Sequence, residues 1–304
     1  MRALVTGASG HLGAALVHTL LAGGGRVAAL VRPESDPWRL EGVMDRVVLV
    51  RGGLDNPRAA AAAIHEFAPE VVFHLAWWGV GRADRDAAEQ VTRNVTGTLA
   101  LFQVAREAGC RCFVGTGSQA EYGPADGVLT EDTPAAPVTA YGTAKLATGM
   151  LLHALGAATG VRTLWLRLLA AYGPADDEAR LIPSTARALL AGGQPALSAG
   201  EQPWDYLYVD DAAEALRAAA ISEAAGTYVL ASGKWPTVRE WVERVRDEVD
   251  PALPLGFGEV AAGPVPGLRG DPARFCRATG WSPRVGMDEG VRRTVSWLRS
   301  HRPR

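Results

Sequence analysis

A tyrosine and a lysine four residues apart are the pair of side chains in this sequence best suited to chemistry. They bound the segment Tyr141-Gly-Thr-Ala-Lys145, and residues four apart on a helix lie on one face. Of the 31 lysines and arginines only Lys145 and Lys234 are lysines, so this chain uses arginine wherever a generic cation serves. A lysine ammonium is compact and can lie beside a phenol and lower its pKa. The pair therefore predicts a tyrosine that acts as an acid and a base.

A glycine-rich turn near the start of the chain predicts a dinucleotide-binding site. Residues 6–13 read TGASGHLG and lie between an apolar strand pattern and the first helical pattern. Gly7 permits the tight turn, Gly10 lets the backbone approach a pyrophosphate, and Gly13 lets the helix lie close to the sheet. The expected cofactor contacts in this turn are Gly7, Ser9, Gly10, His11, Leu12 and Gly13.

The end of the second strand pattern bears on the choice between NAD and NADP. An NAD enzyme usually carries an acidic residue there, where it binds the adenosine ribose. Here Val31 takes that place and Arg32 follows it. A guanidinium can hold a 2′-phosphate with two hydrogen bonds, so the sequence favours NADP(H). The alternative is that Arg32 is solvated and that NAD binds through backbone contacts.

Short apolar runs alternate with helical patterns over the first 170 or so residues, which predicts an α/β fold with a doubly wound parallel sheet (Rossmann). The predicted strands are Ala3–Thr6, Val27–Val31, Val47–Val50, Val71–Leu75, Cys112–Gly115 and Thr163–Leu168. The predicted helices between them are Leu12–Leu21, Pro57–Phe67, Ala87–Ala108 and Thr139–Ala158.

Glycine and proline become denser after Tyr172, which predicts a smaller lobe interleaved with the first domain. We expect the dinucleotide-binding domain at 1–172 with about 205–225, and a substrate-binding lobe at 173–204 and 226–304. Trp204–Val209 fits a further strand, Asp210–Ala220 a helix and Met287–Arg299 a final amphipathic helix.

Composition excludes several classes of protein. A net charge of −2 argues against a nucleic-acid or membrane-surface partner. The sequence contains no run of about eighteen apolar residues, so it predicts no membrane span. The three cysteines, two of them in a Cys-x-Cys segment, cannot form an ordinary set of disulfides or a metal site. With no signal peptide ahead of the first strand, we expect a reduced, cytoplasmic protein that binds no metal.

Taken together, the motifs resemble the extended short-chain dehydrogenase/reductase superfamily, and within it the NAD(P)-dependent sugar-nucleotide epimerase/dehydratase/reductase group. The likeness covers nearly the whole chain. Besides the glycine turn and the Tyr141–Lys145 segment, it includes FHLA at 73–76, NVTGT at 94–98, GTGSQAEYG at 115–123, the segment 167–174, YVDD at 208–211 and GWSP at 280–283.

The resemblance implies a role for each matched residue. Tyr141 would be the acid/base at the reacting oxygen, with its pKa lowered from near 10 by Lys145 and by the positive nicotinamide. Lys145 would also bind the nicotinamide ribose, Ser118 would bind the substrate oxygen, and Asn94 would have a supporting part. Further implied cofactor contacts are Leu54, Leu75 and Ala76. Members of the group commonly form homodimers, to which 87–108 and 139–158 would contribute.

Departures from the family pattern narrow the reaction. The 4,6-dehydratases carry an acidic pair after the Ser/Thr, where this chain has Gln119 and Ala120, and a bifunctional epimerase-reductase carries a Cys at the Ala120 position. The favoured reaction is therefore the reduction of a 4-keto nucleotide-diphosphate sugar by NADPH, as in deoxysugar biosynthesis. A 4-epimerase with retained NAD is the alternative, although Gly53 replaces the adenine-contacting Asp of epimerases. A non-catalytic NAD(P)-binding sensor is a remote third alternative, since such proteins tend to lose the catalytic Tyr or Lys and this chain has both.

The part of the site that would bind the substrate is altered. Family members often hold the diphosphate with an Asn and an Arg at the positions that are Ala170 and Trp204 here. Trp204 could stack on a base. Arg269 matches a late family arginine that contacts the substrate phosphates, while Arg180 and Arg187 are weaker candidates. The expected substrate contacts are Ser118, Gln119, Trp204 and Arg269; one of the adjacent Trp77 and Trp78 could also line this pocket.

Overall fold

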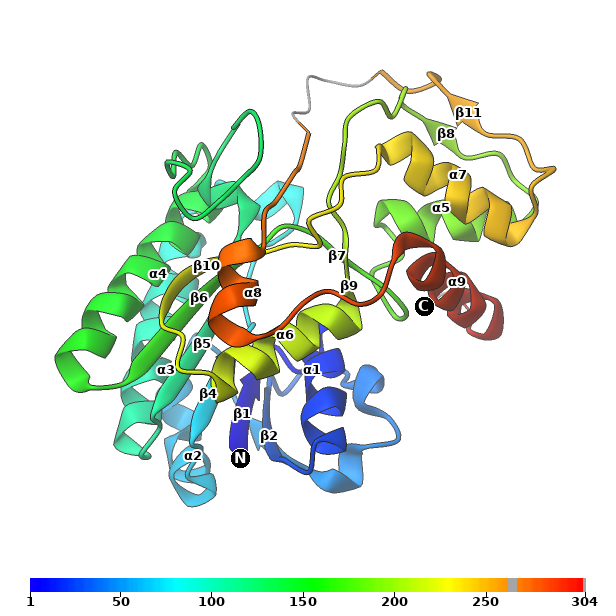
Figure 1. Cartoon of the computed structure of the whole chain (residues 1–304). Coiled ribbons are helices and arrows are strands. Elements are labelled where there is room, and N and C mark those ends of the chain that lie inside the picture. Colours follow the sequence, from blue (N-terminus) through cyan, green and yellow to red (C-terminus); the bar gives the residue numbers. More distant parts are fainter. Residues whose placement is uncertain (262–266, 303–304) are drawn as a thin grey trace.

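A seven-stranded parallel sheet forms the centre of the protein (Figure 1). The computed structural model describes residues 1–261 and 267–302. In sheet order the strands are β10 (Gly226–Leu230), β6 (Arg162–Leu168), β5 (Cys112–Ser118), β4 (Val71–His74), β1 (Arg2–Thr6), β2 (Arg26–Val31) and β3 (Val47–Arg51). All six neighbouring pairs are parallel. The strand order changes direction between β1 and β4, which confirms the predicted doubly wound fold.

Helices cover both faces of the sheet, because its strands are apolar on both sides. One face packs against α1 (His11–Ala22) and α6 (Val209–Ile221), which supply many small side chains to the larger hydrophobic core. The other face packs against α2 (Ala61–Phe67), α3 (Thr96–Glu107) and α4 (Ala140–Thr159) around a second core.

Two of the predicted helices differ in detail from the observed ones. The pattern at 87–108 is a π-helix, η5 (Gln90–Val95), followed by α3, rather than one α-helix. The pattern at 57–67 begins with a 3₁₀ turn, η3 (Pro57–Ala60), before α2. The other 3₁₀ turns are η1 (Trp38–Leu40), η2 (Met44–Arg46), η4 (Arg82–Asp84) and η6 (Gln119–Glu121).

A group of three helices forms a separate hydrophobic core beyond the carboxyl ends of the strands. These are α5 (Leu181–Leu190), α7 (Val238–Val249) and α9 (Met287–Ser300), and beside them lies a small two-stranded sheet of β8 (Ala196–Leu197) and β11 (Gly256–Phe257). The segment 204–209 is a strand only at β9 (Leu207–Tyr208), which pairs with β7 (Ala171–Tyr172) outside the main sheet.

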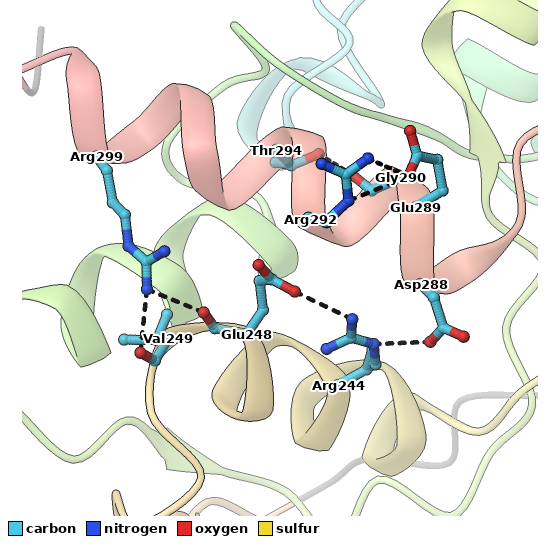
Figure 2. A network of polar contacts seen from close by, with 9 residues as sticks. All are labelled: Arg244, Glu248, Val249, Asp288, Glu289, Gly290, Arg292, Thr294 and Arg299. Atoms are coloured by element: carbon cyan, nitrogen blue, oxygen red, sulfur yellow. Dashed lines mark hydrogen bonds and ion pairs between the residues drawn. The ribbon is translucent and has the colours of Figure 1, made fainter.

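Polar contacts join α7 to α9 (Figure 2). Arg244 of α7 binds both Glu248 on its own helix and Asp288 on α9. Arg299 of α9 donates to the carbonyl oxygens of residues 248 and 249, which stand in the last turn of α7, where a helix leaves its carbonyl oxygens without intrahelical partners. These contacts are largely exposed to solvent, so the apolar side chains between the helices supply most of the stabilisation.

One boundary of the predicted division is wrong. The sequence predicts that residues 226–304 belong to the smaller lobe, but β10 pairs with β6 as the edge strand of the main sheet. The following helix α8 (Ala273–Thr279) also packs on this sheet, where Phe275 contacts Tyr228 of β10. The chain therefore returns twice to the main sheet after residue 205. Among the described residues, no helix is both long and apolar enough to cross a bilayer.

Candidate active site

A cleft at the carboxyl ends of β1, β2 and β4 contains most of the predicted cofactor residues. Its volume is about 420 Å³. Seven of the predicted cofactor contacts line it: Gly7, Ser9, Gly10, Arg32, Leu54, Leu75 and Ala76. The cleft lies where the strand order changes direction, which is where open α/β sheets bind their ligands.

The glycine turn has the tight geometry that the sequence predicts. Gly7 has φ of +68°, and a Cβ there would lie 2.8 Å from the backbone nitrogen of Ala76. A Cβ on Gly13 would collide with the carbonyl oxygen of Gly7. The backbone of the turn is thus folded against the start of α1, with no side chain between them and no acidic residue in the first helical turn. This is a cradle that fits a pyrophosphate.

His11 and Leu12 differ from the expectation for the turn. The His11 ring contacts Asp176 at 3.2 Å and lines a different cavity, and the Leu12 side chain packs on the main core. Burial and the charge of Arg39 lower the pKa of His11 to about 4, so its ring is neutral near pH 7. Any cofactor contact of these two residues must therefore come from the backbone.

The adenosine end of the cleft carries charges of both signs. Arg32 is exposed and forms an ion pair of 3.5 Å with Glu34, while Val31 is buried. Asp55 also lines the cleft, and its carboxylate occupies the space that a side chain on Gly53 would fill. Gly53 replaces the acid that epimerases carry in this region, but the structure places the Asp55 carboxylate beside it.

The three predicted catalytic residues come together at the end of β5 and the start of α4. Ser118 ends β5, and its side chain lies beside Tyr141, where it lowers the pKa of the phenol. Thr139 caps α4 through a bond to the backbone nitrogen of Gly142, which fixes the first turn that carries Tyr141. Lys145 lies one turn further and donates a 2.7 Å hydrogen bond to the carbonyl oxygen of Thr116.

The electrostatics of Tyr141 differ from the expectation. Burial raises its pKa above the ordinary value, and the Ser118 side chain and the charge of Arg85 only partly oppose that shift. Lys145 does not lower it: the Lys145 Nζ lies 6.0 Å from the centroid of the phenol ring and binds Thr116 instead. Before the cofactor binds, Tyr141 is therefore a protonated phenol at neutral pH and can donate a proton.

Lys145 itself is almost fully enclosed. Burial lowers its pKa to about 7, and the negative charge of Glu121 opposes that shift. Three aromatic rings surround the ammonium group: Trp77 at 3.8 Å, Trp165 at 5.6 Å and Tyr141 at 6.0 Å from Nζ to the ring centroid. Faces of aromatic rings attract cations, so this enclosure partly replaces the lost water.

The two adjacent tryptophans have different surroundings. Both line the cofactor cleft, but Trp77 packs on Lys145 and meets Tyr141 edge to face at 6.2 Å. Trp78 lies under the guanidinium of Arg93. Asn94 binds the backbone of Trp78 at both its nitrogen and its carbonyl oxygen, so its supporting part is to hold this loop.

The predicted substrate residues are less well gathered. Gln119 lies in η6, directly after Ser118. Trp204 packs between two small hydrophobic clusters, and its neighbourhood is that of a core residue. Arg269 is partly exposed and bonded through its backbone to Leu129. Arg180, a weaker candidate from the sequence, contributes a charge that lowers the pKa of Tyr141 and therefore lies on the active-site side.

Sequence reasoning assigned no part to Glu121, which is completely buried beside the catalytic residues. A signal for it was present, because Ser118-Gln-Ala-Glu121 has the spacing of a capping box. The structure contains that capping box, in which the two side chains bond to each other's backbone nitrogens at the start of η6.

Comparisons with known proteins agree with this geometry. Residues 3–231 match the NAD dependent epimerase/dehydratase family. A UDP-glucose 4-epimerase of Mycolicibacterium smegmatis is 31% identical over 99% of both chains. A 3-diazoavenalumate denitrifying reductase of a Streptomyces species is 36% identical over 80% of this chain and 79% of its own. A crystal structure of Thermus thermophilus UDP-glucose 4-epimerase with NAD is 29% identical, with a TM-score of 0.84 over 98% of this chain and 99% of that one.

Proposed function

The chain belongs to the NAD-dependent epimerase/dehydratase family, and from that membership we propose that it reduces a 4-keto nucleotide-diphosphate sugar with NADPH. The observation that carries the proposal is the convergence of Ser118, Tyr141 and Lys145 beside the cofactor cleft. The bound nicotinamide would supply the hydride to C4 of the sugar. All other steps would fall to side chains of this chain.

The protonation state of Tyr141 supports reduction. A hydride added to a ketone leaves an alkoxide that must take up a proton, and a phenol whose pKa is raised by burial is protonated and ready to donate. Ser118, whose side chain lies beside Tyr141, would bind the same oxygen and orient it. The resulting phenolate would be reprotonated from solvent, and Lys145 would hold the nicotinamide ribose as in the family.

The residues after Ser118 argue against loss of water from the sugar. Elimination requires groups that remove one proton and donate another, and Gln119 and Ala120 cannot do either. A simple reduction needs only one proton donor at the carbonyl oxygen. This site therefore contains the side chains that a simple reduction requires.

A 4-epimerase is the second candidate, and three observations favour it. A relative that matches over 99% of both chains is named a UDP-glucose 4-epimerase, and the Asp55 carboxylate occupies the space beside Gly53. The ion pair of Arg32 with Glu34 also reduces the positive charge open to a 2′-phosphate. An epimerase would retain its NAD, because the hydride taken from C4 must be returned to it.

One experiment separates the two candidates. The purified protein is denatured, the released nucleotide is identified by mass spectrometry, and oxidation of added NADPH is followed with a 4-keto nucleotide sugar. Turnover of NADPH without tightly held NAD supports the reductase. Retained NAD, with interconversion of two nucleotide sugars and no added cofactor, supports the epimerase instead.

A pair of tyrosine variants ties the activity to the site. Tyr141→Phe is expected to abolish turnover while cofactor binding persists. Tyr228→Phe removes a phenol from β10 at the sheet edge and should leave turnover unchanged. If Tyr141→Phe keeps the activity of the parent protein, both enzyme proposals fail.

A further inference from the structure

A buried carboxylate lies directly behind the catalytic residues. The Glu121 side chain is 0% exposed and receives three hydrogen bonds. One oxygen accepts from the backbone nitrogen of Ser118 at 2.9 Å and from the indole nitrogen of Trp165 at 2.9 Å. The other accepts from the guanidinium of Arg167 at 2.7 Å. A carboxylate removed from water in this way must be held by such bonds, so its position is closely determined.

The first of these bonds connects Glu121 to the reacting groups. Ser118 is fixed at its nitrogen by the Glu121 carboxylate, and its hydroxyl accepts from the backbone nitrogen of Ala120. The Ser118 side chain also acts on Tyr141, whose pKa it lowers. Movement of Glu121 would therefore shift the group that orients the substrate oxygen.

The second bond connects Glu121 to Lys145 through one indole ring. Trp165 points its N–H at Glu121 while its ring lies 5.6 Å from the Lys145 nitrogen. The ring fits here because three neighbours are glycines. A Cβ on Gly115 or Gly117 would lie 2.5 Å from an atom of Trp165, and one on Gly149 would lie 2.8 Å away.

Among the described residues around Lys145, Glu121 carries the negative charge that acts on the ammonium. Three uncharged groups face the ammonium: the phenol of Tyr141 on α4, the indole of Trp77 in the loop after β4, and the carbonyl of Thr116 on β5. β4 presents His74, whose pKa is lowered to about 3 by burial and the charge of Lys145, so it is neutral. β6 presents Trp165, and its Arg167 is bound to Glu121.

We propose that Glu121 is a positioning residue of this active site, which fixes Ser118 through the backbone and keeps the Lys145 ammonium charged across the Trp165 ring. Its part in turnover rests on the proposed function, whereas its effect on the charge of Lys145 does not. Burial lowers the pKa of Lys145 to about 7 even though the Glu121 charge acts in the opposite direction. Loss of that charge would leave the lysine neutral in more of the protein at pH 7 and above.

The lysine content of the chain makes a direct test practical. Protein labelled with ¹³C at the lysine ε-carbons has two such signals, from Lys145 and the exposed Lys234, and the second is an internal reference. The Lys145 signal is titrated in the parent protein and in Glu121→Gln, which keeps the size of the side chain. We expect the Lys145 midpoint to move down by about one pH unit. An unchanged midpoint overturns the proposed counter-ion.

A matched control separates this effect from general loss of stability. Glu131 is likewise shielded from solvent, accepts a backbone hydrogen bond from Val229 and pairs with Arg274, yet it does not contribute to the pKa of Lys145. Glu131→Gln should therefore leave the Lys145 midpoint in place. If Glu121→Gln does not fold, Glu121→Gln/Arg167→Met removes both buried charges, so that neither is left unpaired, and the same downward shift is expected.

Kinetics give the second readout. In Glu121→Gln the alkaline limb of the kcat profile should move to lower pH by the same interval as the Lys145 midpoint, about a tenfold loss of kcat on that limb. At pH values where Lys145 stays charged, the KM for NADPH should change little, because Glu121 does not line the cofactor cleft. A loss of kcat that is equal at every pH would overturn the charge role. A protein without NADPH-dependent activity refutes the proposed function, while the lysine titration still decides the inference about Glu121.

Discussion

The indole of Trp77 covers Lys145, with the ammonium nitrogen 3.8 Å from the ring centroid. Trp77 also lines the cofactor cleft, so one side chain contacts both the catalytic lysine and the space for the dinucleotide. A cation over a desolvated aromatic face is stabilised by about 2 kcal/mol. Trp77 is thus part of the reason that a lysine with no water around it can carry charge.

The adjacent tryptophans offer a matched pair of variants. Trp77→Leu removes the ring from Lys145 and should lower the pKa of that lysine further below its burial-lowered value. We expect kcat to fall several-fold above pH 7 and to recover partly at lower pH. Trp78→Leu, whose ring contacts Arg93 instead, should leave the Lys145 titration unchanged. Equal pH profiles for the two variants would contradict the role given to Trp77.

The glycine turn should tolerate no side chain at its third glycine. In Gly13→Ala the new Cβ would strike the carbonyl oxygen of Gly7, and we expect a loss of about 1–3 kcal/mol in the free energy of unfolding. Affinity for the dinucleotide should drop more than about tenfold, because the turn that cradles it must open. Gly286→Ala, at a position with open space around it, is the control. Urea unfolding measures the loss of stability, and calorimetric titration with NADP and NAD measures the loss of affinity.

Arg32 should decide how well NADPH is preferred to NADH. Arg32→Ala is expected to raise the KM for NADPH about tenfold and to leave that for NADH nearly unchanged, because only a 2′-phosphate needs the guanidinium. Arg51→Ala is a suitable control, since Arg51 reaches only the backbone oxygen of Arg32. If both cofactors respond equally to Arg32→Ala, the preference for NADP(H) is wrong and NAD becomes the expected cofactor.

His74 should make the fold sensitive to acid. Burial lowers its pKa to about 3, whereas in the unfolded chain it titrates near 6.5, so the unfolded state binds more protons between these values. The stabilising contribution of the neutral ring is therefore present above about pH 6.5 and is lost as the pH falls toward 3. Between pH 7 and pH 5 we expect a loss of about 2 kcal/mol from this residue.

Urea unfolding at the two pH values measures this loss. His74→Asn should be less stable than the parent at pH 7, because the ring bonds to Thr6 and Thr98 are altered, but its stability should decline less on acidification. His65→Asn, at an exposed position of α2, should show the full decline of the parent protein. An identical decline in His74→Asn would exclude His74 as its source.

Local spacing made much of the fold and site predictable from the sequence. The glycine turn, the strand–helix alternation and the Tyr141–Lys145 pair each depend on residues within one element or its immediate neighbours. The return of β10 to the main sheet could not be read in this way, because Gly226–Leu230 resembles any short edge strand. Its place depends on pairing with β6, some sixty residues earlier in the chain.

The electrostatics of the site also depended on contacts distant in sequence. Glu121 acquires its role from Trp165 and Arg167, which lie 44 and 46 residues away on β6. The expectation that Lys145 lowers the pKa of Tyr141 was wrong for the protein without cofactor, because the lysine turns toward Thr116. Spacing along a helix places two side chains on one face, but it does not determine which group each will bind.

The packing of Trp165 against Gly115, Gly117 and Gly149 restricts how this active site can evolve. A lineage that keeps the indole must keep all three glycines, because a methyl group at any of them would displace it. Once the indole is replaced by a smaller side chain, Gly115 and Gly149 become free to vary and Glu121 loses a donor at the same moment. A side chain on Gly117 would still collide with the Glu121 carboxylate. These five positions should therefore be inherited together, and descendants that have left the set should differ at several of them at once.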